Sequence, residues 1–222
     1  MLLDNLIAID GPCGSGKSTV AKRLALKLRY KYIDTGAMYR AYTLKAIREN
    51  LDFEKEQELI ELTKHISLDI VDDGTGHIKV LLDKEDVSQH IRTPELTNRV
   101  SYIAKVPSIR EWMVKNQRRI GERGNCVLEG RDIGTVVFPD AKFKFYIDAE
   151  FDERVRRRHK ELIENGSDIS FDALAEDMRI RDEKDKNRKV GALKVADDAI
   201  YVDTTNFGID EVVDKLVGYI QS

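Results

Sequence analysis

Eight consecutive residues, Gly11 to Ser18, match a motif in which two glycines five positions apart precede Lys and then Ser or Thr. Glycines in such a loop let the backbone turn tightly, so that successive N–H groups and the N-terminus of the next helix converge on an anion. Lys17 would reach the β- and γ-phosphates of a nucleoside triphosphate, and the Ser18 hydroxyl would ligate Mg²⁺. We therefore predict a phosphate-binding loop (P-loop), whose ATP-binding residues are Gly11, Pro12, Cys13, Gly14, Ser15, Gly16, Lys17, Ser18 and Thr19.

The segments on either side of this loop predict a strand and a helix. Residues 6–9 read Leu-Ile-Ala-Ile, as in a buried strand, and Val20, Leu24 and Leu28 form an apolar helical stripe. A glycine-rich turn that binds nothing is the competing interpretation, but the strand-loop-helix context favours phosphate binding. Further apolar runs at residues 30–34, 125–129, 142–148 and 199–203 complete a predicted five-stranded parallel sheet, and 209–220 predicts a final helix. The predicted fold class is therefore α/β, a three-layer α/β/α P-loop protein.

Polar side chains follow two of these predicted strands directly. Asp34, Thr35 and Arg40 come after the second strand, and Arg131 and Asp132 lie between two glycines after the third. Ligands of parallel α/β sheets bind outside the carboxyl ends of the strands, and Arg can hold a phosphate with two parallel hydrogen bonds. These residues therefore predict a second anion site. A solvated Arg40 and a structural Arg131–Asp132 ion pair are the alternatives.

Between the second and third predicted strands the sequence indicates a small insert. Residues 41–64 have helical periodicity, whereas 67–71 and 77–82 are β-rich and flank the turn residues 72–76. Thr93 can cap a helix that has Pro94 at its first position, and a further helix is predicted over 108–119. We therefore expect an antiparallel hairpin and several helices in this insert.

The region between the last two predicted strands carries the highest density of charge. Residues 154–160 include Arg154, Arg156, Arg157, Arg158, His159 and Lys160, and most of these are expected to be solvated on a helix. On the next helix an inward line begins with Leu174 and Met178 and continues through Arg181, Asp185 and Arg188. Burying unpaired charge is expensive, so this face is predicted to border a cleft. A helical hairpin of this kind can act as a lid that closes over a transferring phosphoryl group.

The bulk properties exclude several classes of protein. The chain has 222 residues, with 37 Lys and Arg against 40 Asp and Glu, so its net charge of −3 gives no general attraction to nucleic acid or to an acidic membrane. Two cysteines are too few for a disulfide framework, and no run approaches ~18 apolar residues. Because no basic and apolar stretch opens the sequence, we expect a chain that is not exported. We expect a cytoplasmic protein, with no membrane or nucleic-acid partner. His90 and His159 are predicted to be ordinary surface residues.

Among P-loop proteins, a small-molecule kinase fits best. A guanine-nucleotide switch would need a base-reading Asn-Lys-x-Asp segment, which this sequence lacks. Arg40 and Arg131 near the strand ends, together with Arg157, Arg181 and Arg188 in the lid, imply two phosphate-bearing substrates. A kinase of this fold with another acceptor, and a nucleotide-binding scaffold without an acceptor, remain open.

The sequence resembles the bacterial cytidylate kinases nearly from end to end. The resemblance rests on residues 9–18, Asp34 to Arg40, Gly130 to Asp140 and the Arg181-Asp182-x-x-Asp185-x-x-Arg188 pattern. The segment Gly-Arg-Asp-Ile-Gly-Thr is specific to that family among nucleoside monophosphate kinases. The resemblance implies transfer of the γ-phosphoryl group of ATP to CMP or dCMP with Mg²⁺, by a chain that we expect to be monomeric.

The resemblance also implies roles for individual residues. Ser101, Arg110 and Asp132 would read the cytosine edge, while Thr35, Arg40 and Arg131 would hold the acceptor's phosphate end. Arg181 and Asp185 would bind the sugar, and Arg188 would reach towards the phosphates. The predicted catalytic residues are Lys17, Arg131, Arg157 and Arg188, and the predicted metal ligand is Ser18.

Two residues depart from the family pattern. Cys13 replaces a small Ala or Ser, which could make activity sensitive to thiol reagents, and Glu129 stands where Asp is also common. The architecture implied is a core of residues 1–35, 105–150 and 190–222, with a monophosphate-binding insert at about 36–104 and a lid at about 151–189. Closure of the insert and the lid over the core would complete the active site.

Overall fold

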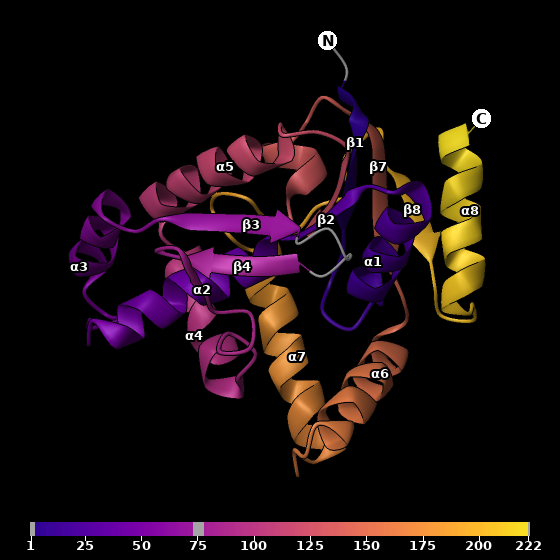
Figure 1. The fold of residues 1–222 in the computed structure, drawn as a ribbon. Helices are drawn as coiled ribbons and strands as arrows, with labels where there is room; N and C mark the ends of the chain where they lie inside the picture. The colour runs from indigo at the N-terminus through magenta and orange to yellow at the C-terminus, as the bar shows by residue number, and fades with distance from the viewer. Residues whose placement is uncertain (1–2, 73–77, 222) are drawn as a thin grey trace.

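A computed structural model describes residues 3–72 and 78–221 (Figure 1). The core strands are β1 (Leu3–Asp10), β2 (Lys31–Asp34), β6 (Cys126–Gly130), β7 (Ala141–Asp148) and β8 (Ile200–Asp203). The helices are α1 (Lys17–Leu28), α2 (Thr35–Arg48), α3 (Glu56–Glu61), α4 (Pro94–Ala104), α5 (Pro107–Gly121), α6 (Phe151–Glu164), α7 (Phe171–Lys186) and α8 (Ile209–Gln221). A small sheet contains β3 (Leu68–Asp72), β4 (Ile78–Leu82) and β5 (Glu85–Asp86).

The central sheet confirms the predicted α/β fold class. Its five strands are all parallel and lie in the order β2-β6-β1-β7-β8. Side chains alternate along β1, so Ile7 and Ile9 pack with α1 and α8, whereas Leu6 and Ala8 pack with α2 and α5 on the other face. Figure 1 shows α1 and α8 side by side and α5 at some distance from them. The molecule therefore has three layers.

The strand order explains where ligands can bind. Strand β1 lies between β6 and β7, and the chain leaves β1 and β6 towards opposite edges of the sheet. Such a reversal opens a crevice at the carboxyl ends of the strands. The register aligns Asp10 with Gly130 on one side and with Tyr146 on the other, so the P-loop and the 130–134 turn leave the sheet side by side.

The insert differs from its prediction in one respect. A single helical stretch over 41–64 was wrong, because α2 begins at Thr35 and ends at Arg48, and α3 starts only at Glu56. Asn50 has a φ of 55°, and Leu51 N donates to Ala46 O at 3.0 Å, which closes the C-terminus of α2. The apolar periodicity continued across this break and concealed it.

The other predicted features of the insert are present. Strands β3 and β4 pair antiparallel with Leu68 opposite Leu82, whereas most of the predicted turn, residues 73–76, lies outside the described residues. Thr93 caps α4 by accepting a hydrogen bond from Leu96 N at 3.3 Å. Helix α5 begins at Pro107. These local signals were sufficient to predict the elements.

Helices α6 and α7 form a hairpin that projects from the sheet (Figure 1). It has a small apolar cluster of its own, made of Val155, Leu174 and Met178. Helix α7 ends at Lys186, so Arg188 lies beyond the helix on which we had placed it. No helix within the described ranges is long and apolar enough to cross a membrane.

Candidate active site

The P-loop adopts a conformation that requires its glycines. A Cβ on Gly11 would lie 2.0 Å from the carbonyl oxygen of Ile147, and Gly16 caps α1 with a φ of 85° and no side chain. The first N–H groups of α1 therefore face the loop and can bind an anion. Lys17 Nζ donates to Pro12 O at 3.0 Å, and burial together with Arg131 lowers the pKa of Lys17 to about 8.

Side-chain oxygen atoms that could ligate a metal ion lie beside the P-loop. Ser18 Oγ donates to Glu129 Oε2 at 2.6 Å, and Tyr32 OH donates to the other oxygen of the same carboxylate. Burial and the neighbouring Asp34 raise the pKa of Glu129. Among the described residues no group of three or more His, Cys, Asp or Glu could hold a metal ion. Mg²⁺ commonly takes one or two protein oxygens and completes its shell with phosphates and water, so this donor set fits it.

The end of β2 presents the first predicted acceptor residues. Asp34 caps α2 by accepting from Ala37 N at 2.9 Å, and Arg40 donates to its other oxygen at 2.8 Å. Thr35 Oγ1 donates to the backbone oxygen of Glu129 at 2.7 Å. The capping carboxylate thus orients Arg40, while Thr35 ties the ends of β2 and β6 together.

The turn after β6 is held by Asp10, a residue that the sequence analysis did not select. Its two carboxylate oxygens accept from Ile133 N and Gly134 N, each at 2.8 Å. Burial raises the pKa of Asp10 to about 7, although both backbone hydrogen bonds oppose this shift. An acidic residue at the end of an apolar strand, immediately before the P-loop, was the available signal.

Three predicted residues meet above this turn. Arg131 Nε donates to Asp185 Oδ2 at 2.8 Å, and Arg188 donates to the other oxygen of Asp185. Burial alone would raise the pKa of Asp185, but Arg131, Arg188 and Arg181 outweigh it and hold that pKa below the usual value. The Asp185 carboxylate therefore holds both guanidinium groups in place, and their other N–H groups can donate hydrogen bonds to an anion.

Arg110 of α5 and Asp132, in the turn after β6, form a buried ion pair. Arg110 also lies 3.5 Å from the backbone oxygen of Gly191, in the segment that follows α7. Burial raises the pKa of Asp132, although Arg110 opposes the shift. These two residues, predicted to read one base, are therefore in direct contact.

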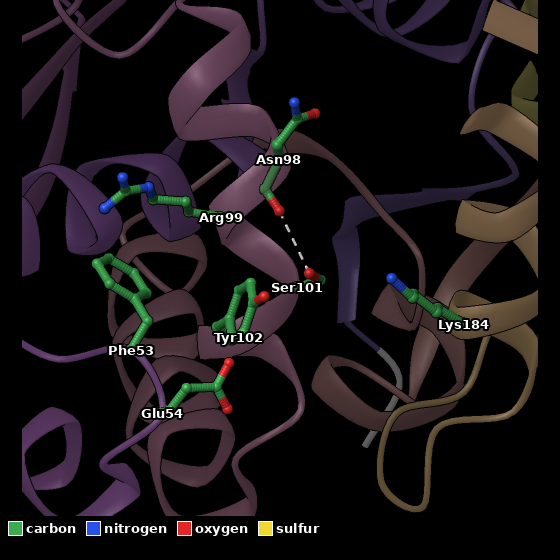
Figure 2. A pocket seen from close by; sticks show the side chains of 7 residues that line it. All are labelled: Phe53, Glu54, Asn98, Arg99, Ser101, Tyr102 and Lys184. Carbon is green, nitrogen blue, oxygen red and sulfur yellow. Dashed lines mark hydrogen bonds between the residues drawn. The ribbon is translucent and has the colours of Figure 1, made fainter. Parts of the chain in front are cut away.

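Two further predicted residues lie away from that pair. Ser101 donates to Asn98 O at 3.3 Å and lines a pocket of about 460 Å³ between α4 and Lys184 of α7 (Figure 2). The other lining residues are Phe53, Glu54, Asn98, Arg99 and Tyr102. Arg181 lies 3.9 Å from the Cys13 sulfur, on the P-loop side of α7. The predicted contacts of Ser101 with the base and of Arg181 with the sugar stay predictions.

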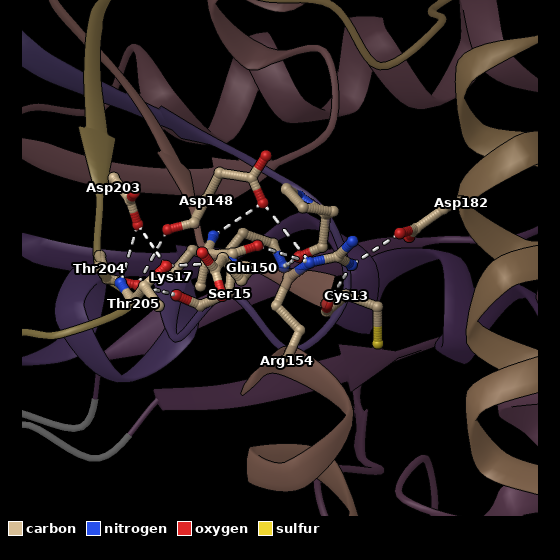
Figure 3. Close-up of polar contacts among 12 residues, drawn as sticks. Cys13, Ser15, Lys17, Asp148, Glu150, Arg154, Asp182, Asp203, Thr204 and Thr205 are labelled. Carbon is tan, nitrogen blue, oxygen red and sulfur yellow. Dashed lines mark hydrogen bonds and ion pairs between the residues drawn. The ribbon is translucent and has the colours of Figure 1, made fainter. Parts of the chain in front are cut away.

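Arg154 and Arg157 lie about one turn apart on α6 and contact different elements. Arg157 donates to Thr204 Oγ1 at 2.9 Å and to Thr204 O at 2.7 Å, so it lies at the end of β8. Arg154 is an exception to the solvated cations expected over residues 154–160, because its side chain is buried and donates to Cys13 O at 3.0 Å (Figure 3). Of the two histidines predicted to be ordinary surface residues, His90 is exposed, whereas His159 is half-buried and contacts Ile169 O.

The P-loop at the reversal of a five-stranded parallel sheet, with a second set of arginines across the crevice, defines a P-loop kinase. Within this class, the sequence model of the cytidylate kinase family matches residues 7–222. The chain belongs to the cytidylate kinase family.

Individual relatives agree with this assignment. The chain is 48% identical over 210 residues to a cytidylate kinase of Caldanaerobacter subterraneus subsp. tengcongensis, covering 95% of this chain and 92% of the relative. It is also 48% identical to a cytidylate kinase of Bacillus thuringiensis, covering 96% and 95%. A solved structure of an uncharacterized protein from Eubacterium ventriosum is similar in fold, with 16% identity, a TM-score of 0.52 and 98% of both chains covered.

Proposed function

We propose that this chain transfers the γ-phosphoryl group of ATP to CMP or dCMP, giving ADP and CDP or dCDP. The observation that carries the proposal is the position of Arg131. It follows Gly130, which lies opposite Asp10 at the start of the P-loop, and it pairs with Asp185 of α7. One guanidinium can therefore reach a phosphate shared by the donor and acceptor sides.

Base recognition is assigned to Asp132 and Arg110. A carboxylate can accept a hydrogen bond from the exocyclic amine of cytosine, and the paired guanidinium can donate to the ring acceptors. Because both side chains are buried, a base that cannot make these bonds would leave polar groups unsatisfied. This arrangement supports discrimination of cytosine from uracil.

Phosphoryl transfer then requires positioning and charge neutralisation by fixed cations. Lys17, Arg131 and Arg188 are assigned to the phosphoryl group during its transfer. Arg40 and Thr35 are assigned to the phosphate of the acceptor nucleotide, and Arg157 to the ATP side of the site. Ser18 and Glu129 would hold the Mg²⁺ of the ATP complex, and the ion would neutralise negative charge on the phosphates. No covalent enzyme intermediate is needed.

The insert at about 36–104 and the lid at about 151–189 are proposed to close over the core around both nucleotides. Closure would bring α7 and its arginines onto the phosphates and exclude water. We propose a monomer, and sedimentation velocity of the purified chain tests this state. The two unpaired cysteines favour the reducing cytosol as its compartment.

The experiment that tests this function is ADP release with ATP and Mg²⁺ against CMP, dCMP, UMP, AMP, GMP and shikimate. Turnover that is strong only with CMP and dCMP is the expected result. Preferred turnover of another acceptor would assign the chain a different substrate within the same fold. Absence of turnover with every acceptor would overturn the kinase proposal.

A further inference from the structure

The guanidinium of Arg154 joins three parts of the molecule that are distant in sequence. Its Nη1 donates to Cys13 O at 3.0 Å in the P-loop and to Asp182 Oδ2 at 2.6 Å on α7, and its Nε donates to Ala149 O at 3.1 Å (Figure 3). The side chain is only 8% exposed. Arg156 of the same helix, by contrast, is exposed and pairs with the half-buried Glu153 one turn away. Arg154 therefore links the P-loop to helix α7 of the predicted lid through direct hydrogen bonds.

Asp182, the partner of Arg154 on α7, is buried in a way that lowers the stability of the fold. Asp182 is 8% exposed, and its Oδ1 is buried with no hydrogen-bond partner among the described residues. A buried carboxylate with an unsatisfied oxygen destabilises the fold relative to an apolar side chain of similar size. Packing alone does not explain why an acid occupies this position.

Backbone and apolar contacts occur at the same junction. A Cβ on Gly14 would lie 2.5 Å from the backbone oxygen of Arg154, so the loop rests directly on the first turn of α6. The Cys13 side chain packs against the Val155, Leu174 and Met178 cluster of the hairpin. Movement of loop residues 13 and 14 therefore cannot occur without a response from α6 and α7.

Helix α7 carries two acidic anchors, three residues apart, that lead to opposite sides of the active site. Asp182 pairs with Arg154 and the P-loop, whereas Asp185 pairs with Arg131 and Arg188 on the acceptor side. A helix is stiff over a single turn, so the position of one anchor determines the position of the other. We propose that the Arg154–Asp182 pair is a positioning device that transmits occupancy of the P-loop to the acceptor side of α7. This inference rests on the proposed function.

The proposal predicts thermodynamic coupling between the two nucleotides. An occupied P-loop would fix Cys13 O, and through Arg154 and Asp182 it would place Asp185, Arg131 and Arg188 for the acceptor phosphate. Binding of a non-hydrolysable ATP analogue should then tighten CMP binding, and CMP should tighten binding of the analogue by the same factor. If the ion pair only stabilises the fold, its loss would lower the melting temperature and leave this coupling factor unchanged.

The test is calorimetric titration of CMP into the full chain, with and without the Mg²⁺ complex of the analogue. Two variants probe the pair. Asp182→Asn removes the charge with little change of shape, and Arg154→Lys keeps the charge but loses the fork that reaches several acceptors. Glu176→Gln is the matched control, because Glu176 lies on the same helix in an exposed ion pair with Arg179.

We expect the analogue to tighten CMP binding to the native chain and to Glu176→Gln, and this factor to fall at least about 5-fold in both pair variants. Affinity for CMP alone should change little. Equal coupling in the native chain and the variants, or no coupling in the native chain, would overturn the proposal. If Asp182→Asn does not fold, Arg154→Lys decides the question. Turnover of CMP by the native chain, measured in parallel, separates this outcome from a failure of the proposed function.

Discussion

Arg131 and Asp185 are 54 residues apart in sequence and are joined by a 2.8 Å hydrogen bond from Nε to Oδ2. The bond connects the end of β6 with the last turn of α7, that is, the core with the helical hairpin. It uses only one edge of the guanidinium, and Nη1 also reaches the backbone oxygen of Gly130 at 3.2 Å. Arg131 is thus held in place by the protein before any phosphate arrives, which is the condition for electrostatic stabilisation without reorganisation.

Replacement of Arg131 should therefore impair the chemical step more than the binding of ATP. We expect Arg131→Ala to lower kcat by about 10³-fold or more, because the developing charge of the transferred phosphoryl group loses a fixed cation. The dissociation constant for ATP should stay nearly unchanged. Steady-state kinetics with CMP and direct ATP titration measure the two effects. Arg131→Lys, which keeps the charge, should recover part of the rate; a normal kcat in the Ala variant would remove Arg131 from the mechanism.

Removal of the Asp132 carboxylate should narrow the preference for CMP over UMP. The two bases differ mainly at the exocyclic amine, and loss of a hydrogen bond to a charged group corresponds to about 10- to 100-fold in discrimination. The ratio of kcat/KM for CMP and UMP in Asp132→Ala measures this effect. Asp140→Ala removes an exposed carboxylate of the same segment and serves as control. An unchanged ratio would move base recognition to another residue.

The same substitution should also destabilise the fold. Arg110 has a side chain only 3% exposed, and Asp132→Ala would leave its charge buried without its partner. Breaking a buried ion pair in this way costs about 3–5 kcal/mol. Urea unfolding should show this loss in Asp132→Ala and a smaller loss in a double variant that also replaces Arg110 with Met. A larger loss in the double variant would contradict the ion-pair explanation.

Local sequence patterns predicted the parts of the site that depend on neighbouring residues. Lys17 and Ser18 are placed by the glycine-rich loop that directly precedes them. Thr93 and Pro94 mark the start of the helix that they cap and begin. Arg131 and Asp132 could be assigned to the crevice because the chain must leave the carboxyl end of a strand there. In each case the sequence signal that places the residue lies within a few residues of it, whereas the ion-pair partner of Arg131, Asp185, is distant in sequence.

The residues that were missed depend on distant parts of the chain. Burial of Arg154 is determined by Cys13, 141 residues away, and by Asp182, 28 residues away, so its helix alone looks like a solvated surface. The end of α7 before Arg188 is accompanied by a hydrogen bond from Leu193 N to Asp185 O at 2.8 Å, made by the segment that follows. The apolar periodicity of the sequence does not predict either contact, because both arise from tertiary packing.

Titration of Asp10 should make stability depend on pH. Burial raises the pKa of Asp10 from 3.8 to about 7, so between about pH 4 and pH 7 the folded chain binds this proton and the unfolded chain does not. The free energy of unfolding should therefore fall as pH rises through this window, by about 1.4 kcal/mol for each pH unit at most. Urea unfolding of the native chain and of Asp10→Asn gives the difference. It should fall from pH 4 to 7 and level off above; a constant difference would show that Asp10 does not titrate in this range.

The two cysteines should react very differently with iodoacetamide. Burial alone would raise the pKa of Cys13, but Arg181, Arg131 and Lys17 together lower it. Cys126 is 1% exposed, and burial raises its pKa to about 12. Because the thiolate is the reactive form, Cys13 should be alkylated first at pH 7 and should be protected by ATP. Peptide mass mapping over time measures both rates, and equal labelling of Cys126 would contradict the assignment.

Finally, Glu129 should determine how much Mg²⁺ the reaction needs. Its carboxylate accepts from Ser18 Oγ at 2.6 Å and from Tyr32, so its position is fixed beside the predicted metal ligand. Glu129→Gln keeps the shape but removes the charge that a hard cation prefers, and we expect the Mg²⁺ concentration for half-maximal rate to rise about 10-fold or more. Binding of ATP without metal should not weaken, because a negative charge near the phosphates has been removed. Glu129→Asp keeps the charge and should stay closer to the native requirement. If Glu129→Gln needs no more Mg²⁺ than the native chain, the metal's protein partner lies elsewhere, and Asp34, at the adjacent position in β2, would be the next residue to replace.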